Sequence, residues 1–401
     1  MALLPVDEAK ARILAGVAPL AAENVKLAEA AGRVLATAVT AARDQPPFPA
    51  SAMDGYAVRG GDVAEVPVSL KVIGMAAAGH GFRGQVGRGE AVRIFTGAPM
   101  PRGADTVVIQ ENTAATATGA VTIRERPRPG QHVRQRALDF ARGETLIAAG
   151  TRLSTRDLGL AAAANRALLR VRKKPLVAIL ATGDELVAPG RKPRADQIVS
   201  SNGQGLAALA RHFGAEVRDL GIVRDDLGAT VRAIKRAAGA DILLTSGGAS
   251  VGEHDFVLAA LKRAGVTVDF WKIAMRPGKP FMYGRRKRQH VMGLPGNPVS
   301  ALVCARLFLK PLLDALLGVG GDAAPTEARL ATAIGANDGR QDYVRATLDV
   351  AADGGRLVRP FARQDSSMQR TFREAQCLII RPPFAPEAPA GSLVPILILD
   401  F

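Results

Sequence analysis

The sequence predicts a multidomain α/β plus β protein whose central part is a mainly parallel α/β domain. At 401 residues the chain is long enough for two to four domains. Between residues 176 and 317, short apolar runs alternate with helical patterns, which is the order of elements in a parallel sheet covered by helices. On either side, residues 45–139 and 323–401 contain short β-branched runs divided by Gly, Pro and Asn, which indicates β-rich domains.

The N-terminal part is predicted to be helical and to be interrupted by the first β-rich segment. Apolar and charged positions alternate at helical spacing from about residue 6 to residue 40, and the helical pattern returns between Ser154 and Leu169. The predicted domains are a discontinuous helix-rich linker domain (1–45 and 140–174), a β-rich inserted domain (46–139), the α/β domain (175–322) and a small β-barrel-like C-terminal domain (323–401).

The α/β segment has a clear order of elements. The expected strands are LVAIL, EVRDLGIV, DILLTS, VTVDFWKIA and VMGLP, and the expected helices run from Asn202 to His212, from Leu227 to Ala238, from Phe256 to Ala264 and onward from Pro298. Ligands of such sheets collect beyond the carboxyl ends of the strands. The residues that follow each strand are therefore the first candidates for a functional site.

Charge and composition narrow the classes of partner. A net charge of +16 is compatible with nucleic acid, an acidic substrate or an Arg-rich proteome. Aromatic residues make up 4% of the chain. This is few for a protein that binds single-stranded nucleic acid by stacking bases on aromatic side chains. The basic cluster at residues 285–288 lies between two expected strands and is predicted to be a solvated hairpin tip. Nucleic-acid binding is therefore the minority interpretation.

The sequence predicts a cytoplasmic protein without structural metal or disulfides. No apolar run approaches the roughly 18 residues that span a bilayer, and Asp7 and Glu8 stand where a secretory signal would carry positive charge. Cys304 and Cys377 lie among apolar neighbours. Two such thiols are expected to pack as small hydrophobes and are too few for a structural zinc site.

The segment ILLTSGGASVGEHD, residues 242–255, is the most informative. A short apolar run passes into a glycine-rich polar loop before the next helical pattern, which indicates a buried strand that ends in an anion-sized loop. Glu253 and Asp255 are close enough in sequence to hold a divalent ion, and His254 is expected at most to support them. The loop predicts phosphate chemistry.

Three further strand ends are polar. The first strand leads into Thr182-Gly183-Asp184-Glu185, where two carboxylates suit a metal or a ribose as well as they suit a turn. WKIA leads into a turn in which Pro277 and Gly278 separate Arg276 from Lys279. Two cations held apart in this way suit a multiply charged oxyanion. The alternative interpretation is a plain surface loop.

The third polar end has a strong structural explanation. Asn297 is a good helix N-cap and Pro298 suits the first helical position, so GNPVS could serve only to start a helix, although such a terminus also presents unpaired amides to an anion. Other phosphate motifs are absent, because the chain has no GxxxxGK[ST] loop, and Gly203-Gln204-Gly205 lacks the third glycine of a dinucleotide fingerprint.

Seven motifs in a fixed order resemble those of the molybdopterin molybdenumtransferase family, which is shared with the E domain of gephyrin. They are SAMDGYAV, FTGAPMPRGADTVV, ATGDELV, SNGQGLAAL, LTSGGASVGEHD, RPGKPFMYG and GLPGNPVSAL. The similarity runs from about Gln45 to Ser366. The α/β segment also resembles that of molybdopterin adenylyltransferases.

The resemblance implies a cytoplasmic homodimer that inserts molybdate into adenylyl-molybdopterin and releases AMP, assisted by Mg²⁺. It also implies contacts with a molybdopterin adenylyltransferase and with molybdoenzyme acceptors, and no membrane. The substrate's own dithiolene sulfurs would hold the molybdenum, so the protein needs an oxyanion pocket, a phosphate cradle and carboxylates rather than cysteine ligands.

The family's functional positions map onto this sequence residue by residue. The resemblance implies catalytic roles for Asp54, Thr96 and Asp139, which are expected to complete the site across the dimer, and for Glu185 and Asp255, which would also bind magnesium. The molybdate ligands would be Arg276, Lys279, Arg345 and Ser366. The substrate-binding residues would be Thr182, Gly183, Asp184, Ser246, Gly247, Gly248, Ser250, Pro295, Gly296, Asn297, Pro298 and Ser300.

Several positions depart from the family pattern. Pro49-Ala50 replaces Asp-Asn, Arg276 stands where Lys is common, Ala137-Leu138 replaces Gly-Glu, and Asp365 replaces a Gly before Ser366. A carboxylate at Asp365 should weaken molybdate binding unless it points away from the pocket.

Two alternative functions remain open. One is a molybdopterin adenylyltransferase-like enzyme, against which the β-rich insert and the C-terminal domain count. The other is a gephyrin-like scaffold or binding module, against which the retained acidic and basic residues count.

Overall fold

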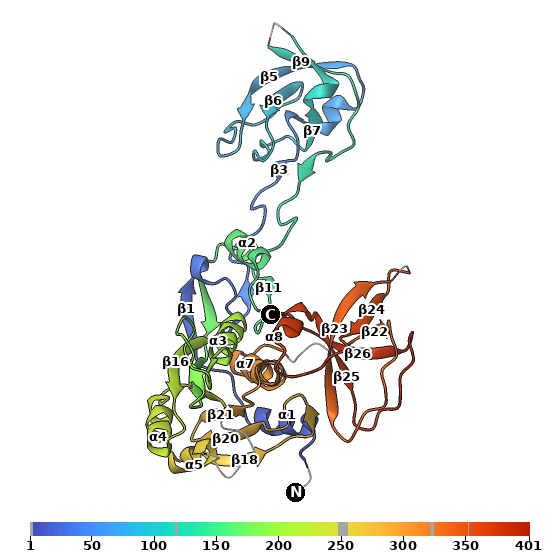
Figure 1. Ribbon diagram of the computed structural model, residues 1–401. Helices are drawn as coiled ribbons and strands as arrows, with labels where there is room; N and C mark the ends of the chain where they lie inside the picture. Colours follow the sequence, from blue (N-terminus) through green and yellow to red (C-terminus); the bar gives the residue numbers. More distant parts are fainter. Residues whose placement is uncertain (1–2, 117–118, 248–255, 321–324, 352) are drawn as a thin grey trace. The chain divides into compact units, whose positions relative to one another are not determined.

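The structure of the protein is a computed structural model that describes residues 3–116, 119–247, 256–320, 325–351 and 353–401 (Figure 1). The chain divides into two compact units, which are described separately. The first consists of Met1–Glu23, Gly32–Ala36 and Arg172–Phe401, and the second of Asn24–Ala31 and Thr37–Val171. The limits of the four domains stay a prediction.

A six-stranded sheet forms the centre of the first unit. Its strands, in order across the sheet, are β16 (Glu216–Val223), β13 (Leu176–Thr182), β17 (Ile242–Ser246), β21 (Gln289–Leu294), β20 (Met282–Arg286) and β18 (Thr267–Trp271). β13 pairs in parallel with β16 and β17, and β17 pairs in parallel with β21. β20 runs antiparallel to both β21 and β18. The predicted mainly parallel sheet is confirmed.

Helices cover both faces of this sheet. They are α1 (Val6–Leu14), α3 (Asn202–His212), α4 (Leu227–Arg236), α5 (Phe256–Arg263), α6 (Pro298–Cys304) and α7 (Lys310–Leu317), and the π-helical segment η4 (Ala305–Leu309) joins the last two. Successive residues of a strand point to opposite faces. Ile179 accordingly packs with α1, α3, α6 and α7, whereas Leu180 packs with α4 and α5. Each face therefore has its own buried core.

Only part of the expected N-terminal helix forms. α1 ends at Leu14, and the chain continues as β1 (Ala22–Lys26), the 3-10 turn η1 (Leu27–Glu29) and β2 (Val39–Thr40). Gly16 takes a left-handed φ of 68° directly after α1, and Pro19 follows it, so the helical pattern cannot continue. The second expected helix is α2 (Thr155–Ala163), which begins with a capping box between Ser154 and Asp157. β12 (Leu168–Arg172) follows it.

A closed five-stranded barrel forms the C-terminal part. Its strands are β22 (Thr326–Leu330), β23 (Gln341–Val350), β24 (Arg356–Pro360), β25 (Cys377–Arg381) and β26 (Leu393–Ile398), with the short helix α8 (Gln369–Glu374) before β25. The order β23-β24-β22-β26-β25 closes because β25 also pairs with β23. The short strand β19 (Met275–Arg276) joins the barrel by parallel pairing with β23. The expected small β domain is confirmed.

The second unit contains the predicted β-rich insert. Its six-stranded sheet has the order β7 (Thr106–Ile109), β4 (Gly55–Val58), β6 (Glu90–Ile94), β5 (Val68–Ala76), β9 (Ala120–Ile123) and β8 (Thr113–Ala115), with the 3-10 turns η2 (Gly60–Val63) and η3 (Gln110–Asn112). Two small ribbons pair β3 (Ala50–Ser51) with β10 (Val133–Arg134) and β2 with β11 (Thr145–Ile147). Val58 and Ala57 lie in two different clusters, so both sheet faces are buried.

Two details of the first unit confirm further expectations. The β20–β21 hairpin turns at Lys287 and Arg288, both exposed, as the solvated tip requires. Cys304 and Cys377 are buried and free, and burial raises the pKa of both thiols. In the part of the chain that the structure describes, no helix is long and apolar enough to cross a membrane.

Candidate active site

The carboxyl ends of β13, β17 and β21 meet at one edge of the sheet. Ala181 is the cross-strand partner of Ser246, and Ser246 is in turn the partner of Leu294. The next residues along the chain are Thr182, Gly247 and Pro295, three of the predicted substrate-binding residues. The structure therefore brings these predicted positions together.

Gly247 is required where the strand tips come closest. A Cβ at this position would lie 2.3 Å from the carbonyl oxygen of Thr182, and its φ of 93° is left-handed. Any side chain would push the tips of β13 and β17 apart. Thr182 is buried beside it, and its hydroxyl has no hydrogen-bond partner within the described residues.

Asn202, which sequence reasoning did not select, links two of the tips. Its side-chain amide donates to Ser246 Oγ at 2.8 Å and to the Gly296 carbonyl at 2.7 Å. The residue opens α3, so the helix start is attached to the ends of β17 and β21. The signal was present in the motif SNGQGLAAL, but its partners could not be deduced from spacing.

Part of the predicted site lies outside the described residues. This is so for Gly248, Ser250 and Asp255 among the predicted site residues, and for Glu253 and His254 in the same loop.

A cavity of about 630 Å³ opens beside these strand tips. It lies within the first unit, between the α/β domain and the loops of the barrel. The predicted site residues that line it are Glu185, Gly247, Arg276, Lys279, Pro295, Gly296, Asn297, Ser300 and Ser366. Its other polar lining side chains are Lys272, Arg340, Gln364 and Asp365. The cavity thus unites residues from three predicted groups: acidic, molybdate-binding and substrate-binding.

The loop that carries Lys279 is held rigidly by the core. A Cβ on Gly278 would lie 2.6 Å from Cys304 Sγ and 3.0 Å from Met275 Sδ, and the φ of Gly278 is 122°. The core thus packs directly against the turn, which fixes where the next residue begins. Lys279 is exposed and, among the residues that the structure describes, no carboxylate pairs with its ammonium group. It is free to contact an anion.

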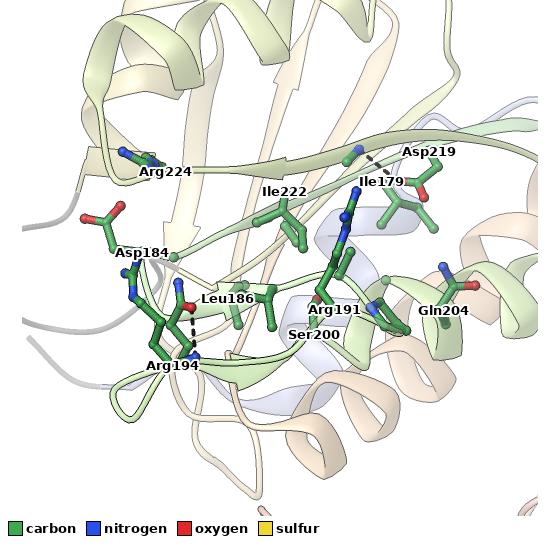
Figure 2. Close-up of a pocket in the computed structure, with 18 residues that line it drawn as sticks. Ile179, Asp184, Leu186, Arg191, Arg194, Ser200, Gln204, Asp219, Ile222 and Arg224 are labelled. Atoms are coloured by element: carbon green, nitrogen blue, oxygen red, sulfur yellow. Dashed lines mark hydrogen bonds between the residues drawn. The ribbon is translucent and has the colours of Figure 1, made fainter.

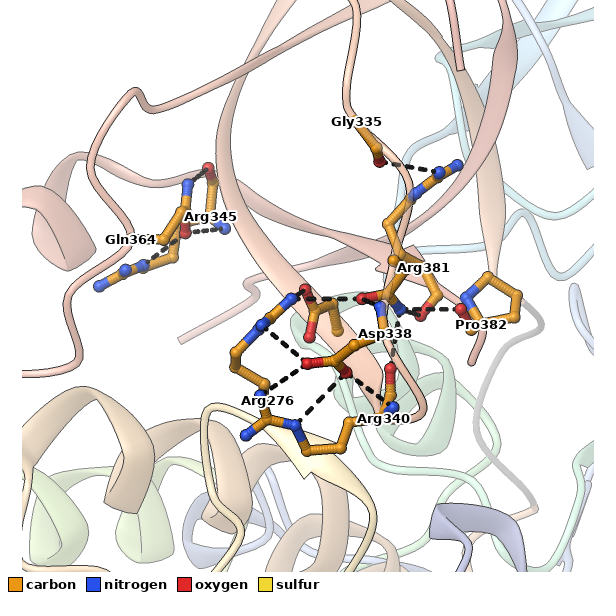
Figure 3. A network of polar contacts seen from close by, with 10 residues as sticks. Arg276, Gly335, Asp338, Arg340, Arg345, Gln364, Arg381 and Pro382 are labelled. Carbon is orange, nitrogen blue, oxygen red and sulfur yellow. Dashed lines mark hydrogen bonds and ion pairs between the residues drawn. The ribbon is translucent and has the colours of Figure 1, made fainter. Parts of the chain in front are cut away.

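Arg276 lines the same cavity but is bound to the barrel (Figure 3). It donates through Nη2 to Asp342 and, at 3.2 Å, to Asn337, while its Nη1 donates to Asp338 at 3.2 Å. Arg340 donates to the same Asp338 carboxylate at 2.8 Å. The hydrogen bonds from Arg340, together with nearby positive charge, lower the pKa of Asp338 to about 2. These acidic partners were not predicted from the sequence.

The surroundings of Asp342 favour the charged carboxylate less than those of Asp338 do. Burial raises its pKa, and the hydrogen bond from Arg276 pulls that pKa back down. Its Oδ1 is buried without a hydrogen-bond partner among the described residues. The hydrogen bond to Asp342 is also the main reason that the pKa of Arg276 is raised. The carboxylate therefore depends mainly on the Arg276 guanidinium, with a smaller contribution from the charge of Arg340.

Ser366 reaches the cavity from the barrel. Its Oγ accepts a hydrogen bond of 2.8 Å from the side-chain amide of Asn297, and its carbonyl accepts from the Val299 amide at 3.1 Å. Among the described residues nothing accepts the hydroxyl proton of Ser366, so it is available for an oxyanion. Asp365, the departure from the family pattern, also lines the cavity, and its Oδ1 accepts hydrogen bonds from the amide and the hydroxyl of Ser367, which lower its pKa.

Arg345 does not line the cavity. It is 1% exposed, and its guanidinium donates to Gln364 Oε1 at 3.0 Å and to the Asp365 carbonyl at 2.6 Å. Burial lowers its pKa. Gln364 completes the arrangement by donating to the carbonyls of Arg345 and Phe361. Arg345 therefore supports the loop that presents Ser366, from behind the cavity wall.

A second cavity, of about 960 Å³, opens on the other side of the β13 tip (Figure 2). The strands β13 and β16, the start of α3 and the segment with the short ribbon β14 (Leu186–Val187) and β15 (Ile198–Val199) surround it. Its charged lining consists of Asp184, Arg191, Arg194, Asp219 and Arg224. Gly183 and Asp184 line this cavity, whereas Glu185 lines the smaller one. The tip of β13 separates the two.

The carboxylates at this tip suit a hard cation in their chemistry. Burial raises the pKa of Asp225, and the negative charges of Asp184 and Glu185 raise it further. A divalent cation would relieve this repulsion. No group of three His, Cys, Asp or Glu side chains that could hold a metal occurs among the described residues.

The predicted residues of the second unit form one contact. Asp54 Oδ1 accepts hydrogen bonds from the amide and the hydroxyl of Thr96, both at 2.7 Å, and these bonds lower the pKa of Asp54. Asp139 is exposed, and its amide donates to the Gln45 carbonyl at 2.9 Å. No hydrogen bond among the described residues joins Asp139 to the Asp54–Thr96 pair.

Fold and site together define a multidomain α/β protein with a cavity, lined in part by Lys279 and Arg276, at the tips of its parallel strands. Three family models match the chain in order: "MoeA N-terminal region (domain I and II)" over residues 4–165, "Probable molybdopterin binding domain" over residues 178–315, and "MoeA C-terminal region (domain IV)" over residues 327–399. The chain belongs to the molybdopterin molybdenumtransferase (MoeA) family.

Relatives and solved structures agree with this membership. The chain is 34% identical to a molybdopterin molybdenumtransferase of Haemophilus influenzae over 98% of both chains. It is 39% identical to one of Nostoc sp. over 81% of this chain and 77% of the relative. The crystal structure of a molybdopterin biosynthesis MoeA protein from Pyrococcus horikosii superposes with a TM-score of 0.85 at 30% identity, covering 100% of both chains.

Proposed function

We propose that the protein inserts molybdate into adenylyl-molybdopterin and releases AMP, which yields molybdenum cofactor. The observation that carries this proposal is the smaller cavity, which is lined by Lys279, whose ammonium group has no carboxylate partner among the described residues, and by Ser366, whose hydroxyl is positioned by Asn297. Family membership supplies the reaction class, and the cavity supplies a place for the metal oxyanion.

The oxyanion would contact Lys279 and Ser366. Molybdate is a dianion whose oxygens accept hydrogen bonds, so a point positive charge and a hydroxyl donor match it. Asn297 orients that hydroxyl, and Arg345 supports the loop behind it. Arg276 adds positive charge at the wall of the cavity.

The two cavities would share one extended substrate. The larger cavity offers Arg191, Arg194 and Arg224 for phosphate oxygens and apolar lining from Ile179 and Ile222 for a ring. We propose that Thr182, Gly183 and Asp184 contact the substrate where it passes between the cavities. Ser246 and Pro298 complete the proposed substrate contacts at the neighbouring tips. Gly248 and Ser250, which lie outside the described residues, are also proposed to bind the substrate.

Magnesium is proposed to bind at the acidic tip. Glu185 and Asp255 would hold it together with phosphate oxygens of the substrate, since Mg²⁺ commonly uses one or two carboxylates plus phosphates. Bound there, the ion would neutralise charge that develops as the phosphoanhydride breaks and AMP leaves. Glu185 would orient the nucleotide, and Lys279 would hold the oxyanion near the dithiolene.

The proposed assembly is a cytoplasmic homodimer in which Asp54, Thr96 and Asp139 of one protomer complete the site of its partner. A molybdopterin adenylyltransferase would supply the adenylylated substrate, and molybdoenzymes would accept the product. Family membership supports the proposal of these partners, and the Asp54–Thr96 pair, whose carboxylate has a lowered pKa, is the part of the second unit that we propose to act in the shared site.

The central test is release of AMP from purified adenylyl-molybdopterin, molybdate and Mg²⁺. We expect release with the wild-type chain, with the exposed control Arg12→Lys, and not with Lys279→Gln. A folded wild-type protein that releases no AMP would refute the proposal. ATP consumption with unadenylated molybdopterin would instead favour the adenylyltransferase alternative.

A mixed dimer tests whether the site is shared. Differently tagged Asp54→Asn and Lys279→Gln chains are co-expressed and the heterodimer is purified. If Asp54 serves the partner's site, one site in each heterodimer is intact, and about half of the wild-type rate returns. If each chain builds its own site, both sites carry one lesion and the heterodimer stays inactive.

A further inference from the structure

Arg276 occupies two environments at once. It lines the smaller cavity, yet three of its N–H contacts go to Asp342, Asp338 and Asn337. Lys279, three residues later, has no carboxylate partner among the described residues. The two cations that the sequence suggested as a pair therefore differ in how far they are free to meet an anion.

We propose that Asp342 is a positioning residue that holds Arg276 to the barrel, so that Arg276 clamps the barrel to the loop at residues 276–280 while Lys279 supplies the anion contact. This inference rests on the proposed function for the identity of the anion. It concerns two residues, Asp342 and its neighbour Asp338, to which no role was assigned from the sequence.

The backbone places the clamp at a junction. Met275 and Arg276 pair in parallel with Gln341 and Asp342, and the Gln341 amide donates to the Ala274 carbonyl at 2.9 Å. Arg276 and Asp342 are thus cross-strand neighbours as well as an ion pair. β19 has only two residues, so side-chain contacts matter for holding this short pairing together.

Burial makes the two partners unequal. The side chain of Asp342 is 12% exposed and that of Arg276 is 47% exposed. Removing Arg276 would leave a buried carboxylate without its counter-ion, which is costly, whereas removing the Asp342 charge would leave an accessible cation. Loss of Asp342 should therefore release positive charge toward the cavity rather than destroy the fold.

An arginine suits this role better than the lysine that is common at this position in the family. The planar guanidinium reaches three acceptors on Asp342, Asp338 and Asn337 at the same time. A lysine ammonium is a single point charge on a flexible chain and cannot span the same fork. The departure from the family pattern therefore strengthens the attachment of the barrel.

The test uses the full chain and two independent readouts. Molybdate affinity is measured by titration calorimetry with sodium molybdate, and the junction is measured by hydrogen exchange of the Gln341 amide. Both are read without adenylyl-molybdopterin. Variants are Asp342→Asn, Arg276→Lys and Lys279→Gln. Arg12→Lys is the matched control, because Arg12 also bridges two carboxylates, Glu8 and Asp269, but away from the cavity.

If the clamp exists, the variants should affect molybdate affinity and hydrogen exchange of the Gln341 amide differently. Asp342→Asn should speed exchange of the Gln341 amide and tighten molybdate binding about three- to tenfold, as expected when a cation loses its carboxylate partner. Arg276→Lys should speed exchange with molybdate affinity within about twofold of wild type. Lys279→Gln should weaken molybdate binding at least about tenfold without changing exchange. Arg12→Lys should change neither.

Opposite patterns overturn the inference. If Arg276→Lys weakens molybdate binding as much as Lys279→Gln and leaves exchange unchanged, Arg276 is an anion ligand and not a clamp. If Asp342→Asn does not fold, Asp338→Asn, at a side chain that is 47% exposed, must show the same directions of change, and its failure to do so also refutes the clamp.

The inference and the proposed function can fail separately. If AMP release fails while the exchange pattern holds, the clamp stands and the reaction is wrong. If AMP is released but exchange at Gln341 is the same in all variants, the reaction stands and the clamp is wrong.

Discussion

The side-chain amide of Asn297 donates a 2.8 Å hydrogen bond to Ser366 Oγ. Asn297 occupies the N-cap position of α6, but its side chain makes no cap hydrogen bond to that helix. Its amide instead crosses to the loop before α8. Asparagine usually starts a helix through its side chain, but the side chain of Asn297 instead joins the α/β domain to the barrel at the wall of the smaller cavity.

Replacing Asn297 by Ala should therefore impair molybdate binding more than folding. The lost hydrogen bond is exposed, so it adds little to the stability of the fold, but without it the Ser366 hydroxyl is no longer oriented, and molybdate affinity should fall about threefold to tenfold. The unfolding midpoint in urea should stay near that of wild type, because no helix cap is lost. Unchanged molybdate affinity in calorimetry, with the Ser366→Ala control weakened, would contradict the assigned role.

Arg345 should behave as a structural support of the same loop. Arg345→Met removes a buried guanidinium and leaves Gln364 Oε1 and the Asp365 carbonyl with fewer donors. We expect a loss of about 2 to 3 kcal/mol in the free energy of unfolding, together with weaker molybdate binding. Urea denaturation of the full chain measures the first. A variant that loses molybdate affinity at full stability would show that Arg345 contacts the anion directly.

Gly278→Ala should disturb both stability and the anion site. The new Cβ would meet Cys304 Sγ at 2.6 Å at a left-handed φ of 122°, and we expect a loss of about 2 kcal/mol with a shifted Lys279. Adding Cys304→Ala should recover part of this loss. Gly159→Ala is the control, because it lies within α2 with nothing within 4 Å; it should be neutral or stabilising.

The free energy of unfolding should fall as the pH is lowered, because the pKa of His290 is lower in the folded protein than in the unfolded chain. Burial, followed by the positive charge of Arg285, lowers its pKa from 6.5 to about 4. The unfolded chain therefore binds a proton near pH 6.5 while the folded protein stays neutral at this site until about pH 4. The contribution is complete above pH 6.5 and is lost as pH falls toward 4, by up to about 1.4 kcal/mol per pH unit.

The measurement is urea unfolding of wild type and His290→Gln between pH 7.5 and pH 4.5. The variant should show a flatter decline over this range. Gly159→Ala, which changes no titratable group, should retain the wild-type slope. Equal slopes for wild type and His290→Gln would disprove the assignment.

Ala137→Gly should stabilise the second unit. Ala137 has a φ of 59°, in the left-handed region that costs a residue with a Cβ about 1 to 2 kcal/mol. Glycine removes this cost but adds freedom to the unfolded chain, so we expect a net gain of about 0.5 to 1 kcal/mol. Ala141→Gly, where φ is not positive, should lower stability. A thermal scan that shows no gain for Ala137→Gly would contradict this account.

Much of the central fold could be predicted because its strands and helices follow from the local spacing of apolar residues in the sequence. The apolar runs at β13, β17 and β21 and the helices between them follow from periodicity, and parallel strands place their carboxyl ends at one edge. Thr182, Ser246 and Pro295 were therefore correctly expected to lie near one another. The N-terminal segment failed as a helix beyond Leu14 because Gly16 and Pro19 override an alanine-rich composition.

The sequence by itself determined which polar residues follow which strand ends, because motif order and strand polarity are written along the chain, and the chemical roles of these residues stay a prediction. Only the tertiary structure decided which of those side chains are free. Arg276 meets carboxylates that lie more than sixty positions later in the chain, and Arg345 is enclosed behind the loop it supports. Of the three, Lys279 alone lines the cavity without a carboxylate partner among the described residues. These differences arise from barrel closure and long-range pairing, which bring together partners that no local spacing can encode.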